Sequence, residues 1–132
     1  MLKILAVTVG GGLGSLLRYT TNAVALKILG DGFPWGTMLV NLLGSFAIGF
    51  LGGWFEFSSA PYLARLFLIT GILGGFTTFS AFSLENLYLL RTGSGKLAAL
   101  NIAISLAGGI ALAAAGFFLA ETLAQASRIG KG

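Results

Sequence analysis

Long apolar runs without a charged residue dominate the chain. Such runs extend over 32–55, 66–84 and 98–120, and a fourth apolar stretch, interrupted by Arg18, begins at Ile4. Each is close to the roughly 20 residues that a helix needs to cross a bilayer. The pattern predicts an all-α membrane protein with four transmembrane helices, over about 2–29, 35–56, 62–90 and 97–125. Short loops join them into a single domain, 1–132.

The third run contains a polar cluster in its middle. Its central sequence is Gly71-Ile72-Leu73-Gly74-Gly75-Phe76-Thr77-Thr78-Phe79-Ser80-Ala81-Phe82-Ser83. A break at membrane depth is tolerated only where the freed backbone groups are buried in protein or line a wet cavity. The cluster therefore predicts that the third helix is broken near its middle. Phe79 and Phe82, three residues apart, then share one helical face beyond the break.

Composition places the chain in a membrane. It is 56% hydrophobic and only 9% charged, with a mean hydropathy of +0.93, whereas about a quarter of a soluble domain is charged. Gly10-Gly11-Gly12 and Arg18 interrupt the first apolar stretch where a cleavable signal would be most hydrophobic, so this stretch is interpreted as the first span. The net charge of +4 is spread over helix ends, and no patch for nucleic acid is expected.

The cations are distributed almost evenly between the two sides of the predicted bundle. One side has four and the other has three, or four if Arg18 reaches it. Because cation bias in short loops sets orientation, this balance favours insertion in both orientations; the alternative is that one dominant loop decides. Glycines at small-xxx-small spacing permit close helix packing, and self-association is expected. The first side carries Lys3, Arg65, Arg128 and Lys131, and the second Lys27, Arg91 and Lys96.

Polar side chains form a stripe on the second span. Thr37, Asn41, Gly44 and Ser45 lie at three- and four-residue spacing and therefore on one face. A structural hydrogen bond between helices would explain Asn41 alone, but a stripe favours a wet path. In the fourth span, Asn101 and Ser105 are four residues apart and extend the same polar seam.

Four further side chains have two interpretations each. Arg18 is the one cation placed within a predicted span; it either snorkels to the interface or makes an electropositive mouth for an anion. Glu85 lies too late in the third span to be the midplane acid of an ion-coupled transporter, but a gating or capping role is open to it. Phe79 and Phe82 either pack in the core or present positive ring edges to an anion.

The residues resemble the Fluc (CrcB) family of fluoride channels. The resemblance covers nearly the whole chain and rests on three motifs in order. They are Gly11-Gly12-Leu13-Gly14-Ser15-Leu16-Leu17-Arg18-Tyr19, Gly36-Thr37 through Asn41 with Gly44-Ser45-Phe46, and Gly74-Gly75-Phe76-Thr77-Thr78-Phe79-Ser80-Ala81-Phe82-Ser83.

The resemblance implies an antiparallel, dual-topology homodimer with two fluoride pores and a structural sodium ion at the centre of the interface. The sodium ligands would be the backbone carbonyls of Gly74 and Thr77. Arg18 would lie in the vestibule and Glu85 near the pore exit. Many members have threonine where this chain has Ala81. The expected fluoride path is lined by Phe79, Phe82, Asn41, Ser80, Ser105 and Thr37.

The implied function is passive export of fluoride across the plasma (bacterial inner) membrane by a multi-pass protein that is not an enzyme. One alternative is a small dual-topology multidrug exporter, which needs an acidic residue in the first span; residues 2–29 contain none. A second alternative is a structural membrane subunit, which the polar broken helix disfavours.

Overall fold

The computed structural model describes residues 1–129, and every element within them is helical. Three turns separate four helical stretches, at positions close to those predicted. Lys131, counted above among the cations, lies outside the described residues. The elements are α1 (Leu2–Leu29), α2 (Trp35–Phe57), α3 (Tyr62–Arg65), η1 (Leu66–Leu73), α4 (Gly74–Phe76), α5 (Phe79–Arg91), α6 (Gly95–Ala103), η2 (Ile104–Gly108) and α7 (Gly109–Ile129), with η1 and η2 π-helical.

Three of these stretches are long and apolar enough to cross a membrane: Trp35–Phe57, Tyr62–Arg91 and Gly95–Ser127. The helix α1 has 28 residues, about 42 Å at 1.5 Å per residue, but is not among the three. Its apolar run is diluted by three charged residues and by consecutive glycines. Its role as a first span therefore remains a prediction that rests on its length.

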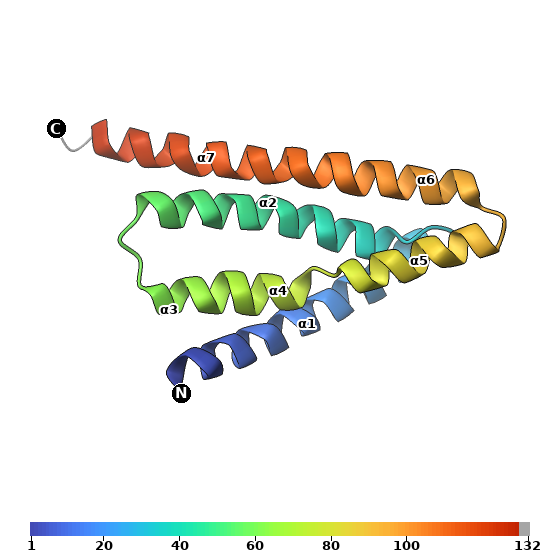
Figure 1. The fold of residues 1–132 in the computed structure, drawn as a ribbon, viewed down its shortest axis with the longest axis horizontal. Coiled ribbons are helices and arrows are strands. Elements are labelled where there is room, and N and C mark those ends of the chain that lie inside the picture. Colours follow the sequence, from blue (N-terminus) through green and yellow to red (C-terminus); the bar gives the residue numbers. More distant parts are fainter. Residues whose placement is uncertain (130–132) are drawn as a thin grey trace.

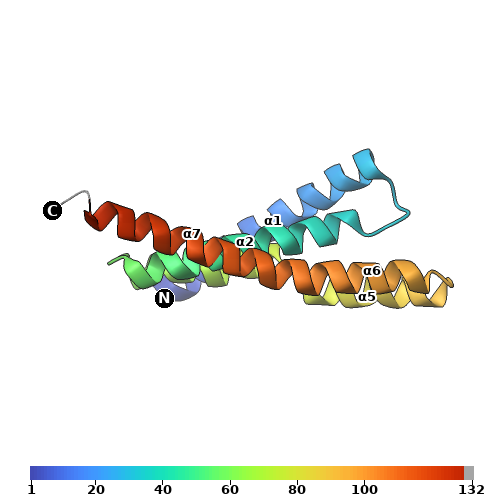
Figure 2. The ribbon, with the colours of Figure 1, turned by 90° about the horizontal axis from the view of Figure 1, so that it is seen from above.

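The third stretch changes its packing partner along its length. The first part, η1 and α4, packs against α1, whereas α5 packs against α6; α2 lies along α7. Figure 1 shows α4 beside α1 and, after a short non-helical link, α5 running toward the turn before α6. Figure 2 shows α5 beneath α6, away from α1. The link between α4 and α5 is thus where the chain passes from one pair of helices to the other.

Small residues allow the helices to approach closely, as their spacing predicted. A Cβ atom built on Gly10 would lie 2.6 Å from the Phe67 carbonyl oxygen and 3.0 Å from the Gly71 Cα. A Cβ on Gly116 would overlap the carbonyl oxygen of Phe46. Only glycine fits at these crossings of α1 with η1 and of α7 with α2, because any side chain there would meet backbone atoms.

The interior is made mostly of small and polar side chains, while most large apolar ones face outward. Val40 is fully buried, and Asn101 is 1% exposed. Large apolar side chains such as Leu16, Ile110 and Phe118 are exposed. This inside-out distribution is that of helices surrounded by lipid or by further protein, because water would penalise so much exposed apolar surface.

Candidate functional site

The helical hydrogen-bond pattern is interrupted at Thr77 and Thr78. Thr77 (φ −75°, ψ 156°) and Thr78 (φ −152°, ψ 121°) both have extended backbones between α4 and α5. The Thr78 hydroxyl caps α5 by accepting a bond from the Ala81 N–H at 3.2 Å. The Thr77 hydroxyl donates back to the Leu73 carbonyl at 3.0 Å. Two adjacent β-branched threonines favour this local geometry, since one ends a helix and the other starts the next.

Asn41 of α2 bonds both backbone groups of Thr78. Its Oδ1 accepts the Thr78 N–H at 2.8 Å, and its Nδ2 donates to the Thr78 carbonyl at 3.0 Å. A buried backbone amide without partners is costly, so this paired contact stabilises the interruption. The sequence left open whether Asn41 serves helix packing or a wet path; the structure shows a contact between helices made specifically to the interruption.

The last carbonyl groups before the interruption lack their regular helical donors, and for two of them the structure shows which group the donor bonds instead. The Thr78 N–H, which would bond the Gly74 carbonyl in a continuous helix, bonds Asn41 instead. The Ala81 N–H, which would bond the Thr77 carbonyl, bonds the Thr78 hydroxyl. Arg18 of α1 donates from Nη1 to the Thr77 carbonyl at 3.3 Å. Its guanidinium therefore reaches inward to the interruption.

A cavity of ≈ 270 Å³ opens beside the interruption, and we call it the break cavity. It brings together four of the side chains predicted for the ion path, from α2, α5 and η2. The rings of Phe79 and Phe82 lie 5.8 Å apart at an interplanar angle of 36°. No charged residue lines the break cavity within the described part of the chain. Its lining is Asn41, Gly44, Ser45, Ile48, Thr77, Thr78, Phe79, Phe82, Ser105 and Leu106.

Ser80 and Ala81 lie at the interruption but do not line the break cavity. The Ser80 hydroxyl is 3.1 Å from the Thr78 hydroxyl, and Ser80 is exposed in this chain. At position 81 the backbone N–H makes the capping bond, which an alanine supplies as well as a threonine would. The missing hydroxyl at Ala81 therefore leaves the local cap intact.

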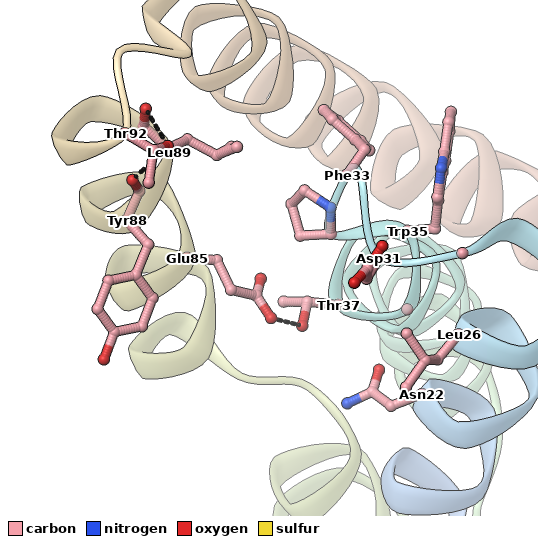
Figure 3. Close-up of a pocket in the computed structure, with 13 residues that line it drawn as sticks. Asn22, Leu26, Asp31, Phe33, Trp35, Thr37, Glu85, Tyr88, Leu89 and Thr92 are labelled. Atoms are coloured by element: carbon pink, nitrogen blue, oxygen red, sulfur yellow. Dashed lines mark hydrogen bonds between the residues drawn. The ribbon is translucent and has the colours of Figure 1, made fainter.

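A second cavity, of ≈ 380 Å³, lies between the start of α2 and α5, and we call it the turn cavity. Thr37 donates from Oγ1 to Glu85 Oε1 at 2.6 Å, as Figure 3 shows. Glu85 Oε2 and Asn22 Oδ1 are buried and have no hydrogen-bond partner among the described residues. The polar stripe on α2 is therefore divided: Thr37 faces the turn cavity, and Asn41 faces the break cavity.

Asn86 and Asn22 were missed in the sequence, and Asn101 was noted only for its spacing with Ser105. Asn86 and Asn101 are almost fully buried and bond each other at 3.2 Å. The available signal was an amide inside each apolar helix, because a buried amide requires a partner. No group of three or more acidic, histidine or cysteine side chains gathers into a metal site among residues 1–129.

Comparison with known proteins identifies the family of this chain. The model of the family described as "CrcB-like protein, Camphor Resistance (CrcB)" matches residues 5–117. A protein of Methylobacterium nodulans named "Fluoride-specific ion channel FluC" is 53% identical over 112 residues, which is 84% of this chain and 90% of that protein.

Further relatives with the same name cover still more of the chain. One from Methylobacterium sp. is 50% identical over 118 residues, covering 89% of this chain and 94% of that protein. One from Agrobacterium fabrum is 44% identical over 124 residues, covering 93% of this chain and 99% of that protein. The match therefore includes α1, the interruption and the α2 stripe together, and the chain belongs to the CrcB family.

Proposed function

We propose that this protein is a fluoride-specific channel that exports fluoride passively across the plasma membrane. The relatives carry the name of such a channel, and the chain is a multi-pass membrane protein. The observation that carries the proposal is the uncharged break cavity, in which two phenylalanine rings stand directly beyond a helix interruption.

Passive flow is sufficient for fluoride export. Hydrogen fluoride is a weak acid that crosses membranes in neutral form and dissociates inside, which traps the anion. A channel lets the anion run down its gradient without any covalent step. The names of the relatives are those of channels rather than of enzymes, in agreement with transport without catalysis.

The chemistry of the break cavity suits a small anion that must also leave. The positive edges of Phe79 and Phe82 attract an anion without a fixed charge, and an ion held by a full charge in a narrow path would leave slowly. Arg18, at the Thr77 carbonyl, supplies positive potential close to the cavity without lining it. Asn41, Ser80 and Ser105 complete the polar surroundings of the proposed path.

Thr37 and Glu85 mark a gate in this proposal. The Thr37–Glu85 bond lies one helical turn along α2 from Asn41, so the path continues from the break cavity toward the turn cavity. A carboxylate there repels an anion unless its charge is offset, and releasing it from Thr37 changes the potential at the mouth.

We further propose that two copies assemble in antiparallel orientation, each with its third helix broken at mid-membrane. Phe79 is 75% exposed in the single chain, and a Cβ on Gly74 would meet only the Ile69 carbonyl oxygen, at 3.8 Å. This open surface at the interruption is space for a second copy. The nearly balanced cations favour insertion in both orientations.

A structural sodium ion between the two copies fits the freed carbonyls. Gly74 and Thr77 offer two backbone oxygens per chain, and four such oxygens suit a hard cation. The Thr77 oxygen has two lone pairs, so the Arg18 bond leaves one for a second contact. Because the ion would bind only the assembled protein, sodium stabilises the dimer by mass action.

Replacing sodium by a large organic cation tests this site without relying on transport. The purified dimer should dissociate or unfold at lower temperature in the sodium-free buffer, and sodium should restore it. Size-exclusion elution and thermal unfolding provide the measurement. Equal stability in both buffers would rule out the sodium site but would not contradict the proposed channel function.

Fluoride efflux from liposomes tests the function itself. Vesicles containing the protein should release fluoride far faster than chloride, and protein-free vesicles should release neither. A multidrug exporter would show neither flux but would move organic cations, and a structural subunit would move none of these. Either of those results would overturn the proposed function.

A further inference from the structure

A chain of hydrogen bonds links α5, α6 and η2 through two buried asparagines. Asn86 donates from Nδ2 to the Phe82 carbonyl at 2.7 Å, and Asn101 donates from Nδ2 to Asn86 Oδ1 at 3.2 Å. Ser105 donates from Oγ to Asn101 Oδ1 at 3.3 Å. Asn86 is 5% exposed and Asn101 is 1% exposed. Neither asparagine lines the break cavity, but the two residues at the ends of the chain, Phe82 and Ser105, both do.

The direction of every bond in this chain follows from its first acceptor. A backbone carbonyl only accepts, so Asn86 must turn its nitrogen to Phe82 and its oxygen to Asn101. Asn101 must then turn its nitrogen to Asn86 and its oxygen to Ser105. Because an amide oxygen only accepts, Ser105 must donate its only proton to Asn101 Oδ1. The hydroxyl of Ser105 therefore presents lone pairs, and no donor, to the break cavity.

Withholding this donor has a consequence for an anion in the cavity. A hydroxyl that donated to the anion would hold it, while a hydroxyl that presents lone pairs does not. A conducting site must bind weakly enough for the ion to leave. The amide chain also anchors the backbone at Phe82, whose ring faces the same cavity.

We propose that Asn86 and Asn101 are positioning residues of the ion path, which keep the Ser105 proton away from the break cavity and fix the Phe82 backbone. This inference rests on the proposed function, because it concerns fluoride passing the break cavity. Neither residue touches the ion; both act through Ser105 and Phe82.

Leucine substitutions test the proposal through single variants and the double variant. Asn86→Leu and Asn101→Leu should each lower fluoride flux about tenfold, the effect of one lost buried hydrogen bond acting on a barrier. The double variant should also lose about tenfold, rather than the product of the two single losses, because each substitution breaks the same series of hydrogen bonds. Replacing both partners by apolar groups restores stability, so thermal unfolding of the double variant should be near that of the wild type.

Single-channel currents in planar bilayers separate positioning from folding. With Asn101→Leu, the freed Ser105 proton binds fluoride, so the current should saturate at a lower fluoride concentration. Adding Ser105→Ala should remove that shift, which a purely structural role of Asn101 would not predict. Thr122→Val is the matched control, because it removes a hydroxyl bond to a helix carbonyl on α7 and Thr122 does not line the break cavity; this variant should conduct normally.

Each remaining outcome contradicts a different claim. Normal flux in the single variants, multiplicative losses in the double variant, or full recovery of flux in the double variant would overturn the positioning role. Wild-type protein without fluoride current would overturn the proposed function, and this inference with it. Wild-type current combined with an unshifted saturation in Asn101→Leu would overturn the inference alone.

Discussion

Asn41 satisfies both backbone groups of Thr78 with one amide. An amide nitrogen carries two hydrogens, and only one is needed for the Thr78 carbonyl, so the second remains for the break cavity that Asn41 lines. A packing role and a role in the ion path are therefore compatible in this one residue.

The Phe82 ring offers the sharpest test at the scale of a single residue. Phe82→Ile keeps an apolar side chain but removes the positive ring edge, so liposomal fluoride efflux should fall at least about tenfold. Size-exclusion elution should remain that of the assembled protein. Phe118→Ile on α7 is the matched control, because Phe118 also pairs with another ring but does not line the break cavity, and it should leave efflux unchanged.

Normal efflux from well-folded Phe82→Ile protein would show that the Phe82 ring serves helix packing and not fluoride conduction. A loss of efflux together with loss of assembly would also fail to support a specific role for the ring, since both then follow from misfolding.

At the scale of elements, the interruption between α4 and α5 is a junction. Helix α4 and η1 pack on α1, and α5 packs on α6, so the chain changes partner at Thr77 and Thr78. The sequence predicted this region because glycines, threonines and serines gather within an apolar run. It did not predict the partners of the freed backbone groups, because Asn41 and Arg18 lie 37 and 59 residues away and their positions depend on how the helices pack.

Two adjacent glycines in α4 provide a matched pair for this junction. A Cβ on Gly75 would lie 3.0 Å from the Gly11 Cα and overlap the Gly11 carbonyl oxygen, whereas a Cβ on Gly74 has room. Gly75→Ala should therefore prevent close packing with α1 and lower the yield of folded protein. Gly74→Ala should leave the chain folded but weaken the sodium-dependent stability of the dimer.

Circular dichroism and thermal unfolding, each with and without sodium, measure both effects. Folded Gly74→Ala protein that keeps the full stabilisation by sodium would show that the interface does not lie at Gly74. Stable Gly75→Ala protein would contradict the close approach of α4 to α1.

At the scale of the whole molecule, the sequence predicted helices better than it predicted contacts. The turns near residues 30–34, 58–61 and 92–94 could be located because Gly, Pro and Ser interrupt the apolar runs. The Asn86–Asn101 bond could not be predicted from the sequence, because it depends on how α5 and α6 align across the turn between them. Arg18 had two interpretations; its guanidinium donates to the Thr77 carbonyl rather than extending to the interface, and its role as an electropositive mouth stays a prediction.

The balance of cations makes a prediction about assembly. Inserting two lysines after Ser59, in the loop between α2 and α3, should bias every copy to one orientation. An antiparallel dimer cannot then form, and fluoride efflux should disappear. Co-expression with a copy biased the opposite way, by lysines inserted after Gly93, should restore efflux.

The same lysines test parallel assembly directly. Full efflux from the copy biased in one orientation alone would rule out the antiparallel dimer, and failure of the paired copies to restore efflux would also contradict it.

The zero-current voltage across a planar bilayer tests fluoride selectivity most directly. With equal chloride on both sides and a fluoride gradient, current through a passive fluoride channel vanishes at the fluoride equilibrium potential. This voltage should change by about 59 mV for each tenfold change in the fluoride ratio, and it should not respond to a chloride gradient. A zero-current voltage that follows chloride, or that stays at zero in the fluoride gradient, would contradict a fluoride-selective channel.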